Sequence, residues 1–174
     1  MSIQTFIKRL KDIMRGDAGV DGDAQRLSQI VWILFLRVFD IREEELSYTD
    51  ENYQPIIPEG YRWRDWAAPL TEDGVVDVKN QMTGDELIEF VNTKLFPVLC
   101  GALVKLEDGT VKVVFTSTDE RALIVKEFLN DANNYMKNGI LFNKGEEIRV
   151  RGTGEGIRFA LICGEPLNEP IAWG

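Results

Sequence analysis

The sequence contains no histidine among its 174 residues and only two cysteines, Cys100 and Cys163. The absence of histidine excludes Ser-His-Asp and Cys-His catalysis, histidine-ligated zinc and the HExxH motif. The two cysteines form no C-x-x-C motif, so the sequence predicts neither a metal site nor a disulfide framework. Two reduced, mostly buried thiols are typical of a cytoplasmic protein, and the cytoplasm is the location that we predict.

Long apolar runs and an excess of basic residues are also missing. The stretch "IVWILFLRVF" (30–39) is about half as long as a bilayer span, and the N-terminal segment has no continuous apolar core, so we expect neither a membrane helix nor a secretory signal. A net charge of −9 opposes nonspecific binding of nucleic acid by the whole surface. A local basic patch remains compatible with it, and the candidates for contact with DNA phosphates are Lys8, Arg9 and Lys11.

The apolar residues that are present recur at helical spacing. They predict an amphipathic helix over residues 3–14 and a longer helix from Ala24 to about Leu46. The second helix is apolar nearly all round in its middle, so we expect other helices or a partner subunit to surround it. Glu43, Glu44 and Glu45 near its end indicate a solvated face or a basic partner. One apolar stripe on this helix comprises Leu27, Ile30, Val31, Leu34, Val38 and Ile41.

Residues 47–82 are predicted to be irregular, and they include "IPEGYRWRDWA" (57–67). Tryptophan, tyrosine and arginine are enriched in interface hot spots, which makes Arg62, Trp63, Arg64 and Trp66 candidates for a partner interface. A second interpretation is a long loop that Trp63 and Trp66 fix to the core of their own domain. The sequence leaves both interpretations open.

Three further elements follow before residue 142. Thr83 and Glu86 have the spacing of a capping box at the start of a helix that Pro97 ends or kinks. "LVKLEDGTVKVVF" (103–115) predicts a small β-hairpin around Asp108-Gly109. A second capping box, Ser117 with Glu120, predicts a helix that continues to residue 136 and ends at Asn138-Gly139.

The pattern changes after residue 142. "EEIRVRGTGEGIRFALICGEPLNEPIAWG" (146–174) contains two alternating runs joined by glycines, which predict a β-hairpin followed by an extended tail. The loop "GTGEG" (152–156) joins two strand-like runs with no helix after it, so it predicts a turn and not a cofactor cradle. The fold class is therefore mainly α. We expect a helical bundle with a β-hairpin insertion over residues 1–142, and a β-hairpin and tail over residues 143–174.

Four segments, in the same order and spacing, resemble the N-terminal helical domain of the modification subunit of type I restriction-modification systems. The resemblance covers residues 1 to about 142. It implies an assembly and DNA-clamping domain attached to an adenine-N6 DNA methyltransferase. The implied partners are the specificity subunit, the restriction subunit and, through the complex, DNA. The four segments are 27–47, 57–67, 82–99 and 125–144.

The catalytic part of that family has no counterpart in this sequence. The family uses a glycine-rich loop for S-adenosylmethionine and an Asn-Pro-Pro-aromatic motif for the flipped adenine. "NEPI" (168–171) departs from that motif, because Glu169 replaces the first proline and Ile171 the aromatic residue. We therefore expect this chain to have no catalytic, cofactor-binding or metal-binding residues and to be inactive alone. The alternative is a fragment that acts as the methyltransferase together with a separate catalytic chain.

The last segment, "GEGIRFALICGEPLNEPIAWG" (154–174), is similar to the closing segment of the pirin family. The histidines and the glutamate of the pirin metal site belong to an N-terminal cupin barrel that this sequence does not contain, so no metal function is implied. The two resemblances together suggest a composite chain with a loosely held tail. A pirin-like function is the remote alternative.

Overall fold

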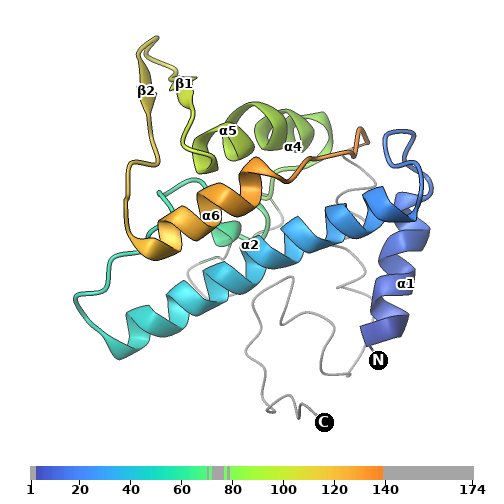
Figure 1. Cartoon of the computed structure of the whole chain (residues 1–174), viewed down its shortest axis with the longest axis horizontal. Helices are drawn as coiled ribbons and strands as arrows, with labels where there is room; N and C mark the ends of the chain where they lie inside the picture. The colour runs from blue at the N-terminus through green and yellow to red at the C-terminus, as the bar shows by residue number, and fades with distance from the viewer. Residues whose placement is uncertain (1–2, 70, 72–76, 78, 139–174) are drawn as a thin grey trace.

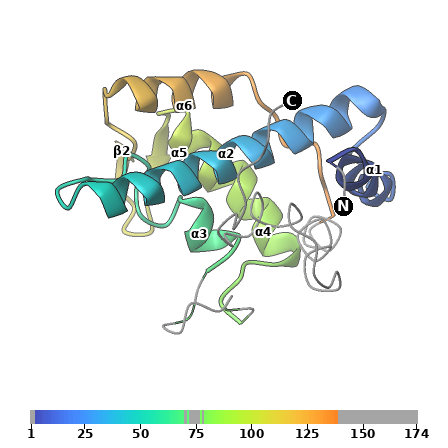
Figure 2. The ribbon, with the colours of Figure 1, turned by 90° about the horizontal axis from the view of Figure 1, so that it is seen from below.

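The computed structural model describes residues 3–69, 71, 77 and 79–138, and this part of the chain is mainly helical. The long helix α2 (Asp23–Thr49) runs across the molecule, and the other helices are arranged around it (Figure 1). Helix α1 (Ile3–Met14), predicted over the same residues, contacts α2 near its N-terminal end (Figure 2). The predicted fold class is confirmed for the helices and the hairpin insertion, while the C-terminal hairpin and tail lie outside the described residues.

One continuous helical stretch is made of α4 (Gly84–Phe90), the π-helical segment η1 (Val91–Leu95) and α5 (Phe96–Leu99). Pro97 does not end this stretch; it lies in the first turn of α5, directly after the π-helical segment. In the middle of a regular α-helix, the proline ring would clash with the carbonyl four residues earlier. The wider π turn accommodates it, and the Phe96 N–H donates to the Val91 carbonyl five residues back. Gly101, with φ of 77°, then ends the stretch. The predicted Thr83–Glu86 capping box is wrong, since no side-chain bond caps α4 within the described residues.

The predicted β-hairpin is confirmed. Strands β1 (Leu103–Lys105) and β2 (Val111–Val113) pair antiparallel, with Leu103 opposite Val113, and the hairpin projects from the helices (Figure 1). Helix α6 (Glu120–Asn130) follows, and its N-cap is Asp119, whose carboxylate accepts a hydrogen bond from the Arg121 N–H at 2.9 Å. The predicted capping box of Ser117 with Glu120 is therefore wrong.

Helix α6 also ends six residues before the predicted residue 136, because the chain after it makes other hydrogen bonds. Residues 131–138 form a non-helical segment, which we call the exit segment. Gln29 of α2 accepts from the Tyr135 N–H at 3.0 Å and donates to the Asn134 side chain at 2.8 Å. These bonds take the place of the last helical turns.

The core lies between α2, α3 (Trp63–Trp66), the α4–α5 stretch and α6. Trp32 of α2 is fully buried and meets Phe96 edge-on, with 5.1 Å between ring centroids. Phe35 of α2 stacks on Phe128 of α6 at 3.9 Å, which joins these two helices side by side. None of the described helices is long and apolar enough to cross a membrane.

The orientation of α2 differs from the expected one. Of the predicted stripe, Ile30 is buried, but Leu27, Val31 and Val38 are between 45% and 50% exposed. The opposite side of the helix is buried, and it includes polar residues that the periodicity analysis did not place in the core. These buried polar residues of α2 are Gln29, Arg37, Asp40 and Glu43.

Candidate functional site

The tryptophans of the predicted interface are buried in their own domain. Trp63 is 1% exposed and Trp66 is fully buried, and their ring centroids lie 4.9 Å apart. Trp66 also approaches Phe90 of α4 at 5.9 Å. Neither ring offers a surface to a partner, so the prediction that Trp63 and Trp66 contact a partner directly is wrong. Both rings are packed in the core, as the second interpretation expected.

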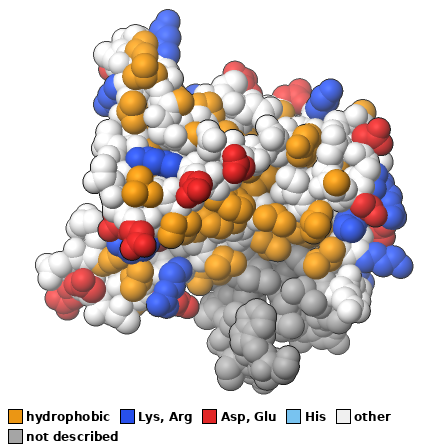
Figure 3. Space-filling model, viewed as in Figure 1, with side chains coloured by type: hydrophobic (Ala, Val, Ile, Leu, Met, Phe, Trp, Pro, Cys, Tyr) orange, Lys and Arg blue, Asp and Glu red, His pale blue; other side chains and the backbone are white. Residues whose placement is uncertain are grey.

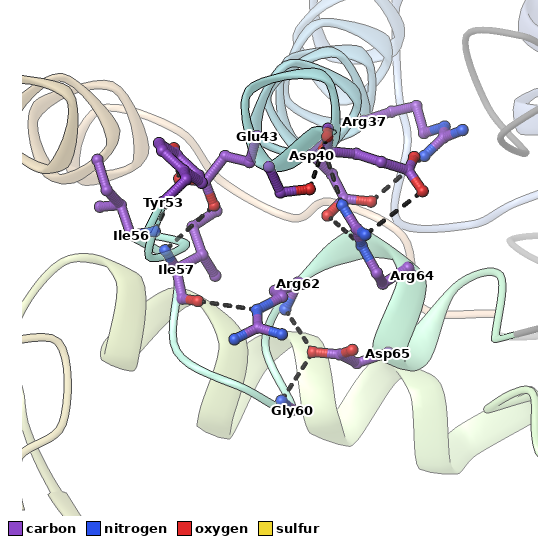
Figure 4. A network of polar contacts seen from close by, with 12 residues as sticks. Arg37, Asp40, Glu43, Tyr53, Ile56, Ile57, Gly60, Arg62, Arg64 and Asp65 are labelled. Atoms are coloured by element: carbon purple, nitrogen blue, oxygen red, sulfur yellow. Dashed lines mark hydrogen bonds and ion pairs between the residues drawn. The ribbon is translucent and has the colours of Figure 1, made fainter. Parts of the chain in front are cut away.

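The arginines beside them are bound to their own domain as well (Figure 4). Arg64 donates from Nε to the Asp40 carboxylate at 3.0 Å and from its terminal nitrogen to the Asp40 carbonyl at 3.0 Å. Arg37 donates to the same carboxylate at 3.3 Å, and Asp40 is 1% exposed. Arg62 donates to the Ile57 carbonyl at 3.1 Å. The Arg64 side chain is nevertheless 34% exposed.

Burial and charge act against each other in this ion network. Burial raises the pKa of the Asp40 carboxyl, and it outweighs the lowering by Arg64 and Arg37. Burial lowers the pKa of the Arg64 guanidinium, but the charges of Asp40 and Glu44 more than reverse this and raise it. The network therefore joins α3 to the inward side of α2 and has a structural role.

Glu43 forms a second buried contact on the inward side of α2 (Figure 4). Its carboxylate accepts hydrogen bonds from the Tyr53 hydroxyl at 2.9 Å, the Ile56 N–H at 2.7 Å and the Ile57 N–H at 3.4 Å. Burial raises the pKa of Tyr53, and the hydrogen bond with Glu43 adds to this shift. Because Glu43 is 3% exposed, the prediction of a solvated face for 43–45 is wrong at its first residue.

An apolar surface lies on the outward side of α2. We call it the apolar strip. On α2 it consists of Leu27, Val31 and Val38, and on α6 of Leu123 and Ile124, which are 52% and 50% exposed. Between the two helices lie the half-buried rings of Phe35 and Phe128. Figure 3 shows hydrophobic side chains gathered in a band along α2, with acidic side chains at its α6 side.

The acidic residues of α6 lie on the same helix face as its part of the strip. Glu120 and Glu127 are each three or four residues from Leu123 and Ile124, and both glutamates are exposed. No ion pair joins either glutamate to another described residue. On α2, by contrast, Arg42 already pairs with Glu45 at 2.8 Å. The strip therefore has an acidic border along α6.

The basic residues of α1 lie elsewhere on the surface. Lys8 and Arg9 are exposed and Lys11 is half-buried, and we call these three residues the α1 basic cluster. Basic side chains are visible at the α1 edge of the molecule in Figure 3. The structure thus brings the three sequence-predicted residues together on one short helix.

The described residues contain no group of three or more carboxylates and thiols that could hold a metal ion. Burial raises the pKa of the Cys100 thiol, which disfavours the reactive thiolate. The arrangement of these residues is suited to binding a macromolecule, because its distinctive features are an apolar strip and charged surfaces.

The exit segment is a feature that sequence analysis missed. Asp17, 4% exposed, accepts hydrogen bonds from the N–H groups of Lys137 at 3.1 Å and Asn138 at 2.9 Å. At Gly19 an added Cβ would lie 2.1 Å from the Tyr135 carbonyl oxygen. These contacts attach the end of the described domain to its beginning. No local motif marks them, since they join residues about 120 positions apart.

The sequence profile of the HsdM N-terminal domain family matches residues 3–138. The Type I restriction enzyme EcoEI methylase subunit of Escherichia coli is 46% identical over 173 residues, which cover 97% of this chain and 31% of that protein. The alignment thus extends beyond residue 142, and the pirin resemblance of the tail stays a prediction. The chain spans about a third of the length of this relative.

Two solved structures are similar to the chain. One is a modification subunit from Vibrio vulnificus YJ016, assigned to a type I restriction enzyme. It has 29% identity and a TM-score of 0.60 over 83% of this chain and 29% of that chain. The other comes from a study of complex assembly and conformational transition of the type I R-M system. It has 26% identity and a TM-score of 0.59 over 86% of this chain and 26% of that chain. The chain belongs to the HsdM N-terminal domain family.

Proposed function

We propose that the described domain assembles a type I modification subunit with its specificity subunit, and so helps the complex to close around DNA. The observation that carries this proposal is the apolar strip on α2. A helix that buries four polar residues and leaves Leu27, Val31 and Val38 half exposed has an outward face suited to protein contact. Similarity to a chain from a type I complex supports the same function.

DNA and the restriction subunit are the further partners of the proposal. The α1 basic cluster is the candidate for contact with DNA phosphates, because exposed Lys8 and Arg9 and half-buried Lys11 lie together on one helix of an otherwise acidic chain. Arg62 and Arg64 remain candidates for a partner contact, since both are only partly buried. Trp63 and Trp66 are packed in the core and hold the segment that carries Arg62 and Arg64 in place.

Methyl transfer is proposed for the whole modification subunit and not for this domain. We propose that the 174-residue chain binds no S-adenosylmethionine and transfers no methyl group alone, and that the complex acts in the cytoplasm. Transfer of a labelled methyl group to DNA by the isolated chain would contradict this part of the proposal.

Co-purification tests the assembly function. The full chain and the specificity subunit are co-expressed, one of them is tagged, and the mass of the eluted complex is measured by light scattering. The proposal predicts a stable complex of the two chains. As a control, Val111→Asp adds a charge at an exposed apolar position on the hairpin, 60% exposed and outside the strip, and should leave the complex intact. Elution of the unchanged chain alone would refute the proposed function.

A further inference from the structure

We infer that the apolar strip of α2 and α6 binds an amphipathic helix of the specificity subunit whose apolar side is bordered by lysine or arginine. This inference rests on the proposed function and adds the chemistry and shape of the docking element. It combines two features that lie together: the half-exposed apolar residues of two neighbouring helices, and two glutamates on α6 that form no ion pair with other described residues.

The dimensions of the strip suit a short helix. Leu27 and Val38 are eleven positions apart on α2, which corresponds to about 16 Å or three helical turns. Leu123 and Ile124 add apolar contacts from α6, and the stacked rings of Phe35 and Phe128 connect the two helices. A helix placed along α2 would therefore contact both helices and complete their packing.

The charge beside the strip determines which side chains should border the apolar side of the partner helix. Glu120 and Glu127 are exposed, lie next to Leu123 and Ile124 on one face of α6, and form no ion pair with other described residues. A partner helix that covers Leu123 and Ile124 would bring its flanking side chains close to these carboxylates. Basic side chains would be attracted there, and acidic ones would be repelled.

Two other occupants fit less well. In a symmetric dimer of this chain, the same surface would meet itself, and the α6 glutamates of two chains with a net charge of −9 each would be brought together. Residues 139–174 carry four basic and five acidic side chains, so they offer no basic excess for the acidic border. A helix from a separate subunit with basic flanks is the occupant that the charges favour.

The test measures the affinity of the full chain for the specificity subunit by fluorescence anisotropy, over a series of salt concentrations. Val31→Asp with Val38→Asp places charge in the strip, and we expect affinity to fall by about 30-fold or more. Glu120→Lys with Glu127→Lys reverses the border, and we expect roughly 10-fold weaker binding with the largest effect at low salt. The controls on the hairpin are Val111→Asp and Glu107→Lys, each with half the charge change of the corresponding double variant, and for both we expect changes of less than about twofold.

The possible outcomes distinguish a failure of the inference from a failure of the proposed function. No complex with the unchanged chain would refute the proposed function and this inference with it. A complex that tolerates both aspartates in the strip would refute the inference alone. Tighter binding by the Glu120→Lys, Glu127→Lys variant would show an acidic partner and overturn the proposed chemistry. Sedimentation that finds a dimer of the chain, dissociated by Val31→Asp with Val38→Asp, would assign the strip to a second copy and also overturn the inference.

Discussion

Helix α2 should respond to substitution in the opposite way from an ordinary surface helix. Removing the charged side chain of Glu43 should destabilise the domain strongly, whereas introducing a charge at Val38 should do little. The reason is that Glu43 is 3% exposed and accepts three hydrogen bonds, while Val38 is 47% exposed. The two substitutions lie five positions apart on one helix, so they share the same secondary structure and differ in the side that they face.

The magnitudes follow from the contacts. Glu43→Ala leaves the N–H groups of Ile56 and Ile57 without their acceptor, and each unsatisfied buried donor costs about 1–3 kcal/mol, so we expect a loss of about 3 kcal/mol in the free energy of unfolding. The Tyr53 hydroxyl keeps a partner, because Arg121 donates to it at 2.6 Å. Val38→Asp forfeits only about half the burial energy of a valine, so we expect a loss of about 1 kcal/mol.

Urea unfolding followed by circular dichroism measures both changes, with unfolding free energies extrapolated from the midpoint and slope. The control is Glu45→Ala, whose side chain is 57% exposed, and we expect its effect to stay within about 0.5 kcal/mol. A loss at Val38→Asp that equals or exceeds the loss at Glu43→Ala would refute the assignment of inward and outward sides. Equal effects of Glu43→Ala and Glu45→Ala would refute the structural role of the buried carboxylate.

Three further predictions concern other parts of the domain. Gly19→Ala should displace the exit segment, because the new Cβ would lie 2.1 Å from the Tyr135 carbonyl oxygen. The exchange of the Lys137 amide hydrogen with solvent should therefore become faster, and unchanged protection of this amide would contradict the prediction. Burial raises the pKa of Asp40, so the stability contributed by this carboxyl is fully present below its ordinary value of 3.8 and is lost as the pH rises through the raised value. Asp40→Asn should therefore remove a component of stability that falls as the pH rises above 3.8. A variant whose stability falls more steeply with rising pH than that of the unchanged chain would refute the sign. In the assembled complex, replacing the α1 basic cluster with glutamine should reduce the slope of log affinity for DNA against log salt by about 2 to 3, and an unchanged slope would exclude phosphate contacts there.

Local patterns in the sequence predicted the elements with strong periodicity. Helix α1 and the β-hairpin formed where expected, because an amphipathic repeat and an Asp-Gly turn specify them without distant contacts. The two capping boxes failed, since the spacing of Ser117 and Glu120 does not reveal that Asp119, between them, is the better N-cap. The early end of α6 depends on Gln29, about 105 positions away, which no local pattern contains.

The inward side of α2 could not be read from its apolar residues, because these cover most of the helix surface. A signal was nevertheless present in the polar residues: Gln29, Asp40 and Glu43 fall on one side at helical spacing. Each of them is buried because its hydrogen-bond partners come from the exit segment, from α3 or from residues 53–57. Trp63 and Trp66 are core residues for a similar reason, since Trp66 packs against Phe90 of α4, which is distant in the sequence, although their sequence context resembles an interface.

The most direct test of this account is the labelling rate of a single cysteine at Val38, in a chain whose Cys100 and Cys163 are replaced with serine. The rate of reaction with a maleimide reagent is measured for the chain alone and for its complex with the specificity subunit. We expect fast labelling of the free chain and much slower labelling in the complex, because the partner would cover the apolar strip. Slow labelling of the free chain, or the same rate before and after assembly, would contradict it.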